Sequence, residues 1–195
     1  MIRNDIVLIG PMKVGKSTVA EMLSKRLNLP HIRLDLLRWD YFNKMGWTED
    51  KLQKNRDELS ELGFMEFCSS LELPMLSMIF DDYHNCIFDF GGGNAMYSEP
   101  NEVQQVKDLI NNFPNSFLIL PSADLAESML TINRRNSEYK GRGRHFTLSE
   151  LKVNSDILKY HYEHPIASHT IYNLHMSAHD VAEKIISLMD TKSQS

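Results

Sequence analysis

The sequence predicts an α/β fold in which a parallel sheet carries helices on both faces. Short continuous apolar runs recur along the chain, and such runs are typical of strands that are buried on both faces of a sheet. Longer amphipathic segments lie between them, with apolar residues spaced three or four positions apart, as in helices. Because strands and helices alternate along the chain, we expect the strands to be parallel.

The composition limits the class of protein. The 195 residues are enough for one sizeable domain, and 42% hydrophobic and 24% charged residues are typical of a globular protein. The net charge of −5 argues against a nucleic-acid partner, although a local basic patch remains open. No apolar run approaches the roughly 18 residues of a membrane span, and no signal peptide is recognisable. We therefore expect a cytoplasmic protein without a membrane partner, and the sequence leaves the oligomeric state open.

The segment from Gly10 to Thr18 is the motif around which the chain is organised. It follows an apolar run, Ile6 to Ile9, and precedes an amphipathic run, Val19 to Leu27. A strand, a glycine-bounded loop and a helix in this order are the context of a phosphate-binding loop. The amides of the loop and the N-terminus of the helix can together hold a polyphosphate. The motif therefore predicts binding of a nucleoside triphosphate.

The residues of this loop have distinct expected roles. Gly10 and Gly15 let the backbone wrap closely around the phosphates. Lys16 is expected to reach the outer phosphates, and the Ser17 hydroxyl is expected to ligate Mg²⁺. The predicted nucleotide-binding residues are Gly10, Met12, Lys13, Val14, Gly15, Lys16, Ser17 and Thr18.

A second apolar run, His31 to Leu34, predicts a short strand that ends at Asp35. Ligands of such sheets bind at the carboxyl ends of the strands, so Asp35 is expected near the phosphates. Residues 36–84 have a helical pattern, which predicts one helix from Thr48 to Leu62, ended by Gly63, and another helix after it. The segment is too long for a simple crossover, which predicts an acceptor-binding subdomain. A helical cover for the sheet is the alternative, and one segment can serve both purposes.

The next apolar run, Cys86 to Phe90, predicts a buried strand that contains Asp89. An apolar strand leading to an acid is the pattern of the second metal-binding motif of phosphate-loop proteins, so Asp89 is a predicted Mg²⁺ ligand. Gly91, Gly92 and Gly93 follow, and their bare backbone amides are predicted to contact the acceptor. A loop that requires positive φ angles explains three glycines equally well, and the sequence does not separate the two.

A basic segment, 134–147, is predicted to form a lid. It contains Arg134, Arg142 and Arg144 in a chain that is acidic overall. Such a lid closes over the phosphates, and its arginines stabilise the transferring group. The alternative is a solvated loop without a role in binding.

Turn and capping residues delimit the other elements of the second half. The predicted elements are a helix from Ser98 to Asn111, a strand from Phe117 to Leu120, a helix from Ser122 to about Arg135, a helix opened by the capping box Thr147 to Glu150, a strand over 168–173 and a last helix opened by Ser177 to Asp180. Residues 191–195 are expected to be a frayed tail.

These motifs, in this order, resemble the shikimate-kinase-like group of small P-loop kinases within the P-loop NTPase superfamily. The resemblance lies in Ile6 to Thr18, in the spacing to Asp35 and in the strand that ends at Gly91 to Gly93. It implies a three-layer fold in a single domain over 1–190, with five parallel strands in the order 2-3-1-4-5. It also implies ATP as the donor and a lid arginine at Arg134, Arg142 or Arg144.

Two departures from the family bear on the acceptor. Shikimate kinases usually carry two acids around the end of the second strand, and here Arg33 takes the first position, before Asp35. They also carry an arginine in the helical segment that grips the shikimate carboxylate, and none lies between Gly63 and Phe67. A carboxylate needs a fixed cationic partner. The sequence therefore predicts an acceptor other than shikimate.

Together the motifs predict an ATP-dependent phosphotransferase that moves the γ-phosphate to a hydroxyl of a small acceptor. The predicted catalytic residues are Lys16, Asp35, Arg134, Arg142 and Arg144, with Asp35 orienting or deprotonating the hydroxyl. The alternatives are an ATPase or nucleotide-dependent switch on the same fold, and a nucleoside or polynucleotide kinase.

Overall fold

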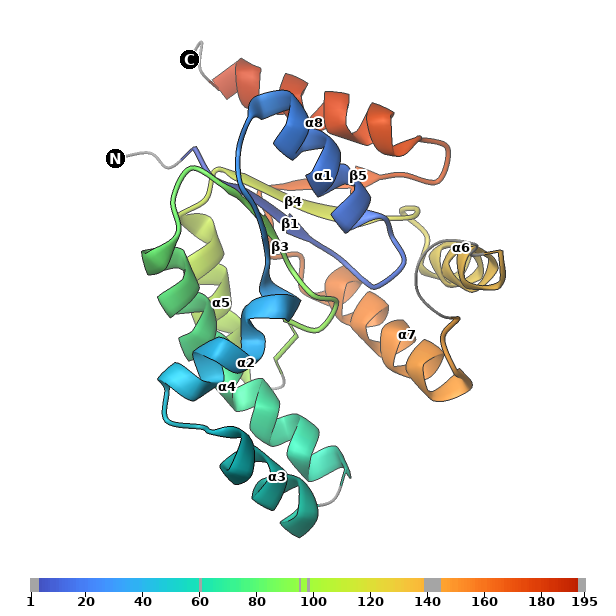
Figure 1. The fold of residues 1–195 in the computed structure, drawn as a ribbon. Helices are drawn as coiled ribbons and strands as arrows, with labels where there is room; N and C mark the ends of the chain where they lie inside the picture. Colours follow the sequence, from blue (N-terminus) through green and yellow to red (C-terminus); the bar gives the residue numbers. More distant parts are fainter. Residues whose placement is uncertain (1–3, 60, 95, 98, 139–144, 193–195) are drawn as a thin grey trace.

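A five-stranded parallel sheet forms the centre of the protein (Figure 1). The computed structural model describes residues 4–192 except 60, 95, 98 and 139–144. The strands lie in the order β2-β3-β1-β4-β5, and every neighbouring pair is parallel, so the predicted order is confirmed. They are β1 (Ile6–Ile9), β2 (His31–Arg33), β3 (Ile87–Asp89), β4 (Asn115–Leu120) and β5 (His169–Tyr172).

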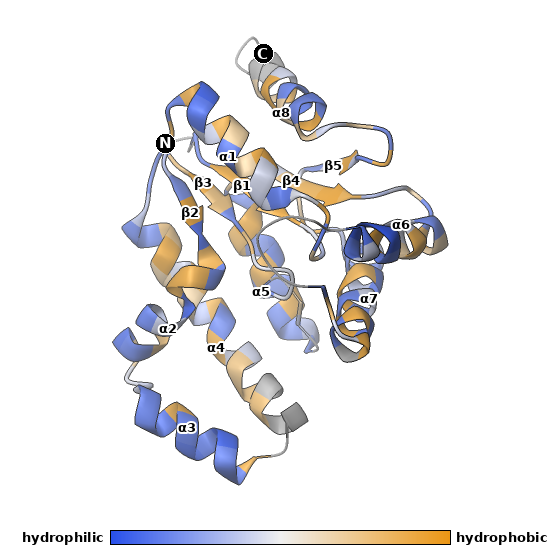
Figure 2. Cartoon of the chain, turned by 45° about the vertical axis from the view of Figure 1, so that its right-hand side comes forward, coloured by the Kyte–Doolittle hydropathy of each residue, from blue (hydrophilic) through white to orange (hydrophobic). Residues whose placement is uncertain are grey.

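Helices cover both faces of this sheet, which gives the predicted three layers (Figure 1). The described helices are α1 (Lys16–Leu27), α2 (Leu34–Lys44), α3 (Glu49–Glu58), α4 (Glu61–Asp82), α5 (Pro100–Asn111), α6 (Leu125–Ser137), α7 (Leu148–Glu163) and α8 (Ala178–Lys192). Neighbouring residues of a strand point to opposite faces. Ile6 and Leu8 accordingly pack with α1 and α8, whereas Val7 and Ile9 pack with α4, α5 and α7. The apolar strands between helices with hydrophilic outer surfaces are visible in Figure 2.

The helices of the segment 36–84 extend beyond the sheet, and the largely hydrophilic α3 lies farthest from it (Figure 2). The predicted end of the helix from Thr48 to Leu62 is wrong. α3 ends at Glu58, because Leu59 has an extended backbone, and Gly63 lies inside α4. A glycine inside a helix costs only about 1 kcal/mol relative to alanine, which packing along a long helix can offset. α4 also continues through Pro74.

The N-termini of the helices show which of the predicted capping residues form capping hydrogen bonds. The box of Thr147 and Glu150 is formed by both of its hydrogen bonds, and Ser177 and Asp180 bond to each other in the same way. Ser122 does not open α6, since Asp124 occupies the N-cap and accepts a bond from the Glu127 amide at 2.7 Å.

The other starts depart from expectation in smaller ways. Thr48 sits at the N-cap of α3 without a side-chain capping bond. Ser98 lies outside the described residues, and α5 begins at Pro100 after Glu99. In the described part of the chain, no helix is both long and apolar enough to cross a bilayer.

Candidate active site

The loop between β1 and α1 takes a shape that depends on its two glycines. Gly10 has a φ of 144°, and a Cβ there would lie 2.3 Å from the carbonyl oxygen of Ile119 on β4. Gly15 has a φ of 103° and forms the N-cap of α1. Both conformations are accessible mainly to glycine. The loop therefore wraps around the N-terminus of α1 while it lies directly against the neighbouring strand.

A cavity of about 570 Å³ opens at this loop, at the carboxyl ends of β1 and β3. Its volume lies in the range of small-molecule sites. The residues that line it are Met12, Lys13, Gly15, Lys16, Ser17, Thr18, Asp35, Asp89, Phe90, Gly91, Gly92, Arg135 and Glu138. Most of the residues predicted from sequence therefore lie around one cavity, although they come from three separate segments of the chain.

Three of the predicted loop residues do not line this cavity. Gly10 and Val14 lie beneath it, and their carbonyl oxygens accept hydrogen bonds from other residues of the site. Gly93 is exposed. These residues shape the loops rather than face a ligand in this structure.

Lys16 is the first residue of α1, and only 7% of it is exposed. Its ammonium group donates to the carbonyl oxygens of Gly10 at 2.7 Å and Pro11 at 2.8 Å. Burial lowers the pKa of Lys16 from 10.5 to about 8, and the charges of Asp89 and Asp35 oppose this shift. An anion at this point would stabilise the protonated ammonium group.

Asp89 ends β3 and is 3% exposed. The ring nitrogen Nε2 of His31, on the neighbouring strand β2, lies 3.2 Å from Asp89 Oδ2 and fixes the carboxylate. Ser17 lines the same cavity. Hydroxyl and carboxylate oxygens suit Mg²⁺, which usually keeps waters and phosphate oxygens as its other ligands. These two residues therefore fit the metal, although no group of three His, Cys, Asp or Glu side chains among the described residues could hold an ion alone.

Asp35 lies in the first turn of α2 rather than after a strand that reaches Leu34. Its Cβ is 3.6 Å from the position that a Cβ on Gly91 would take, so the carboxylate lies beside the glycine loop. Arg33, at the end of β2, donates to Asp35 Oδ2 at 3.1 Å. Both side chains are partly exposed, and they form an ion pair. Where the related kinases usually carry a second acid, this chain thus places a cation beside Asp35.

Two asparagines that the sequence did not single out hold the phosphate loop. Asn154 of α7 is 1% exposed, accepts from the Met12 amide at 2.8 Å and donates to the Met12 carbonyl at 3.1 Å. Asn173, after β5, donates to the Val14 carbonyl at 2.8 Å. No local pattern marks these residues, because each contact joins positions more than 140 residues apart.

Among the arginines that the structure describes, Arg135, in the last turn of α6, lines the cavity. It donates to the Val14 carbonyl at 3.3 Å and to Asn173 Oδ1 at 3.2 Å. Burial, and then the charge of Arg134, lower the pKa of Arg135. Arg134 is exposed and lines a different cavity, beside Leu174 and His175.

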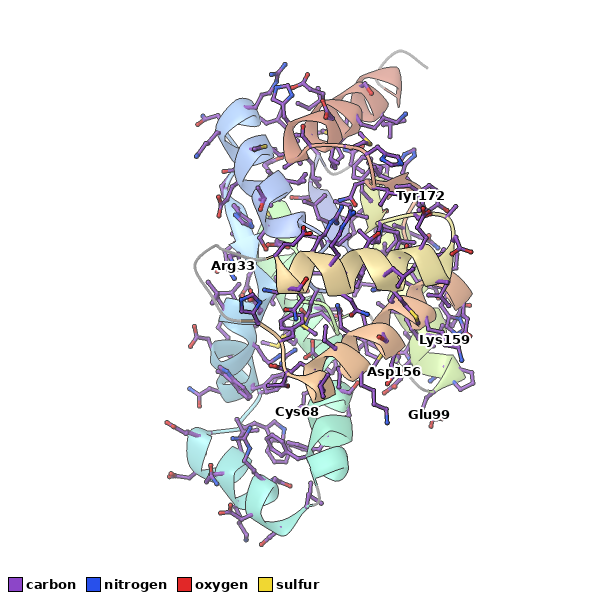
Figure 3. The ribbon with its side chains drawn as sticks, turned by 90° about the vertical axis from the view of Figure 1, so that its right-hand side faces the viewer. Arg33, Cys68, Glu99, Asp156, Lys159 and Tyr172 are labelled. Atoms are coloured by element: carbon purple, nitrogen blue, oxygen red, sulfur yellow. The ribbon has the colours of Figure 1, made fainter. Side chains whose placement is uncertain are left out.

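The other two predicted arginines, Arg142 and Arg144, lie outside the described residues, as does most of the basic part of the predicted lid. Asp156 and Lys159 project from the outer face of the following helix, α7, away from the site (Figure 3).

Comparison with known proteins agrees with this geometry. No family model matches the chain. Over 106 residues the chain is 29% identical to a shikimate kinase of Flavobacterium psychrophilum, and the match covers 54% of this chain and 56% of that protein. The chain thus spans about half the length of the curated relatives it matches.

Crystal structures with a similar fold include two kinases. A shikimate kinase from Bacteroides thetaiotaomicron has a TM-score of 0.60 and 18% identity, over 97% of this chain and 98% of that chain. A gluconokinase from Sinorhizobium meliloti has a TM-score of 0.57 and 14% identity, over 99% of this chain and 95% of that chain. At such identities the likeness concerns the fold alone. The chain is therefore shikimate-kinase-like in sequence and has the fold of the small P-loop kinases.

Proposed function

We propose that this protein is an ATP-dependent phosphotransferase that moves the γ-phosphate of ATP to a hydroxyl of a small acceptor. The observation that carries the proposal is the single cavity lined by Lys16, Ser17, Asp35 and Asp89. A cation for the phosphates, two oxygen ligands for a metal and an acid for the acceptor are the parts that phosphoryl transfer requires. The similarity to shikimate kinases in sequence supports the same activity.

One side of the cavity binds the nucleotide and the metal ion. The loop amides and Lys16 bind the β- and γ-phosphates, and Ser17 and Asp89 hold Mg²⁺. Mg²⁺ bound there supplies positive charge that neutralises the phosphate oxygens. Lys16 has to exchange its bonds to the loop carbonyls for bonds to phosphate oxygens, which are stronger because both partners are charged.

The acceptor binds beside Asp35, Gly91 and Gly92. The Asp35 carboxylate orients the acceptor hydroxyl and takes up its proton as the new oxygen–phosphorus bond forms and the bond from the γ-phosphorus to the bridging oxygen breaks, which releases ADP. Arg135 places positive charge at the cavity during transfer, the role expected of a lid arginine. Closure of the segment 134–147 over the site would exclude water, so that the phosphate passes to the acceptor rather than to water.

Two variants test this proposal. Lys16→Ala is expected to abolish transfer, and Asp35→Asn is expected to keep ATP binding but to lower transfer by about 10²-fold or more. Transfer is measured with γ-labelled ATP and a set of small alcohols, and ATP binding is measured by calorimetry. If the Asp35→Asn protein transfers phosphate at the wild-type rate, the role of Asp35 is wrong.

One observation favours an ATPase as a second candidate. Arg33 donates to the Asp35 carboxylate, so an acceptor hydroxyl would have to compete with an existing partner for that side chain. Asp89 is instead buried and fixed by His31, so it could position a water molecule for attack on the γ-phosphate. ATP hydrolysis that no small alcohol stimulates would support this candidate over the kinase.

A further inference from the structure

A group of buried polar side chains lies next to the phosphate cavity and is not used by the steps above. We call Arg38, Glu72, Asn94, Tyr160 and His161 the acceptor-side cluster. They come from α2, α4, the loop after β3 and α7. Apart from the half-buried Arg38, all are buried.

The centre of the cluster is an ion pair with balanced charge. Arg38 Nη2 lies 2.5 Å from Glu72 Oε1, and the Asn94 amide donates to the other carboxylate oxygen, Oε2. Because a carboxylate only accepts, the amide nitrogen of Asn94 must face Glu72. The amide oxygen of Asn94 therefore points the other way.

Several polar atoms of the cluster have no hydrogen-bond partner within the described part of the chain. They are Arg38 Nε, Asn94 Oδ1 and both ring nitrogens of His161. Leaving a buried polar atom unpaired costs about 1–3 kcal/mol, so folded proteins rarely keep several together without a ligand or water. The clustering of such atoms at one place points to a binding site.

The position of Asn94 connects the cluster to the reaction site. Its Oδ1 lies 2.5 Å from the position that a Cβ on Gly91 would take, and Asp35 Cβ lies 3.6 Å from the same position. The unpaired oxygen thus lies against the glycine that lines the phosphate cavity. Only glycine leaves room for it there.

The position of His161 supports the same connection. Asn154, Ile157 and His161 follow one another at helical spacing along one face of α7. Asn154 binds Met12, and Ile157 Cδ1 lies 3.7 Å from the position that a Cβ on Gly92 would take. Burial, and then the charge of Lys16, lower the pKa of His161 to about 3, so the ring is neutral and has one donor and one acceptor.

We propose that the acceptor-side cluster binds an uncharged polyhydroxylated acceptor and discriminates against carboxylates. The proposal rests on the kinase function proposed above. A hydroxyl can donate to Asn94 Oδ1 and can both donate to and accept from the ring of His161. A carboxylate can only accept, so it cannot satisfy Asn94 Oδ1.

Charge gives a second reason for this selectivity. The only cation of the cluster, Arg38, is already paired with Glu72, and Lys16, whose charge reaches His161, is assigned to the phosphates of ATP, so a bound carboxylate would have no cationic partner of its own. A desolvated anion without a cationic partner is strongly disfavoured.

Matched pairs of acceptors test the proposal on the full wild-type chain. The pairs are sorbitol and gluconate, glycerol and glycerate, and methyl shikimate and shikimate, each assayed with γ-labelled ATP and Mg²⁺. The expected result is a kcat/KM at least about tenfold higher for the uncharged member of the pairs that react. Preference for the carboxylate member overturns the proposal, and so does the absence of transfer to every uncharged compound when ATP binding is intact.

A charge variant tests the role of the ion pair. Glu72→Gln keeps the side-chain shape but leaves Arg38 uncompensated, so the ratio of kcat/KM for carboxylate over uncharged acceptor is expected to rise about tenfold or more. Glu163→Gln, at an exposed position of α7, is the control and leaves the ratio unchanged. An unchanged ratio in folded Glu72→Gln protein overturns the proposal, and if that variant does not fold, the wild-type pairs decide. Failure of wild-type protein to bind ATP contradicts the kinase function instead.

Discussion

The lowered pKa of Lys16 predicts a specific dependence of stability on pH. Its pKa is about 8 in the folded protein, against 10.5 for an exposed lysine. Between these two values the unfolded chain binds more protons than the folded chain, so the free energy of unfolding rises with pH across this window. Integrated from pH 7 to pH 10, the gain from this one group is about 2.5 kcal/mol. Lys16→Met lacks it.

Urea unfolding of both proteins between pH 7 and pH 10 measures the effect, because the other titrating groups are common to both and cancel. Lys16→Met also loses the two bonds to the loop carbonyls, but that loss shifts its stability by a constant amount at every pH. Lys159→Met, at an exposed position on the outer face of α7 (Figure 3), is the control and should follow the wild type. A stability difference between wild type and Lys16→Met that stays flat over this range would refute the reasoning.

Four substitutions test the contacts around the loop and the assignment of the arginines. Asn154→Leu removes both bonds to the Met12 backbone and is expected to lower the free energy of unfolding by about 2–4 kcal/mol, measured with urea; an unchanged midpoint would contradict this. Arg135→Gln is expected to lower kcat/KM by about 10²-fold, whereas Arg134→Gln stays within about twofold, and equal losses would show that the arginines are misassigned. Gly92→Ala places a Cβ 2.6 Å from Met12 Cγ and 3.2 Å from its amide nitrogen. The Kd for ATP should then rise about tenfold, and an unchanged Kd would mean that the loop yields freely.

The parts of the fold that the sequence predicted are those that local patterns encode. Buried strands have continuous apolar runs, and the order of the sheet followed from the resemblance to a known family. The loop from Gly10 to Thr18 carries its own signal, since two glycines, a lysine and a hydroxyl have fixed spacing. Asp35 was singled out because residues at the carboxyl ends of parallel strands meet at one edge, and Asp89 because an apolar strand leads to an acid there. Local rules and topology were sufficient to place both residues at the cavity, and their roles remain predictions.

The parts that the sequence missed depend on contacts between distant segments. Asn154 touches Met12 only because α7 packs across the sheet, and nothing near Asn154 in the sequence marks it. Arg135 rather than Arg134 faces the cavity because of the way α6 is rotated about its axis. Two consecutive arginines give no sign in the sequence of which one points toward the site. The helix boundary at Gly63 was misplaced because a glycine is a weak stop signal when the residues around it can still pack.

The geometry of α7 has a consequence for how the two substrates influence each other. Asn154 forms hydrogen bonds with Met12 of the phosphate loop. His161 lies two turns farther along α7, about 10 Å away, in the acceptor-side cluster. Because α7 contributes residues to both sites, a shift of this helix on binding at one site would also move the residues of the other site. If ATP and the acceptor bind at these two sites as proposed, we expect their occupancy to be thermodynamically linked, so that whatever factor ATP imposes on acceptor affinity, the acceptor imposes on ATP affinity in return.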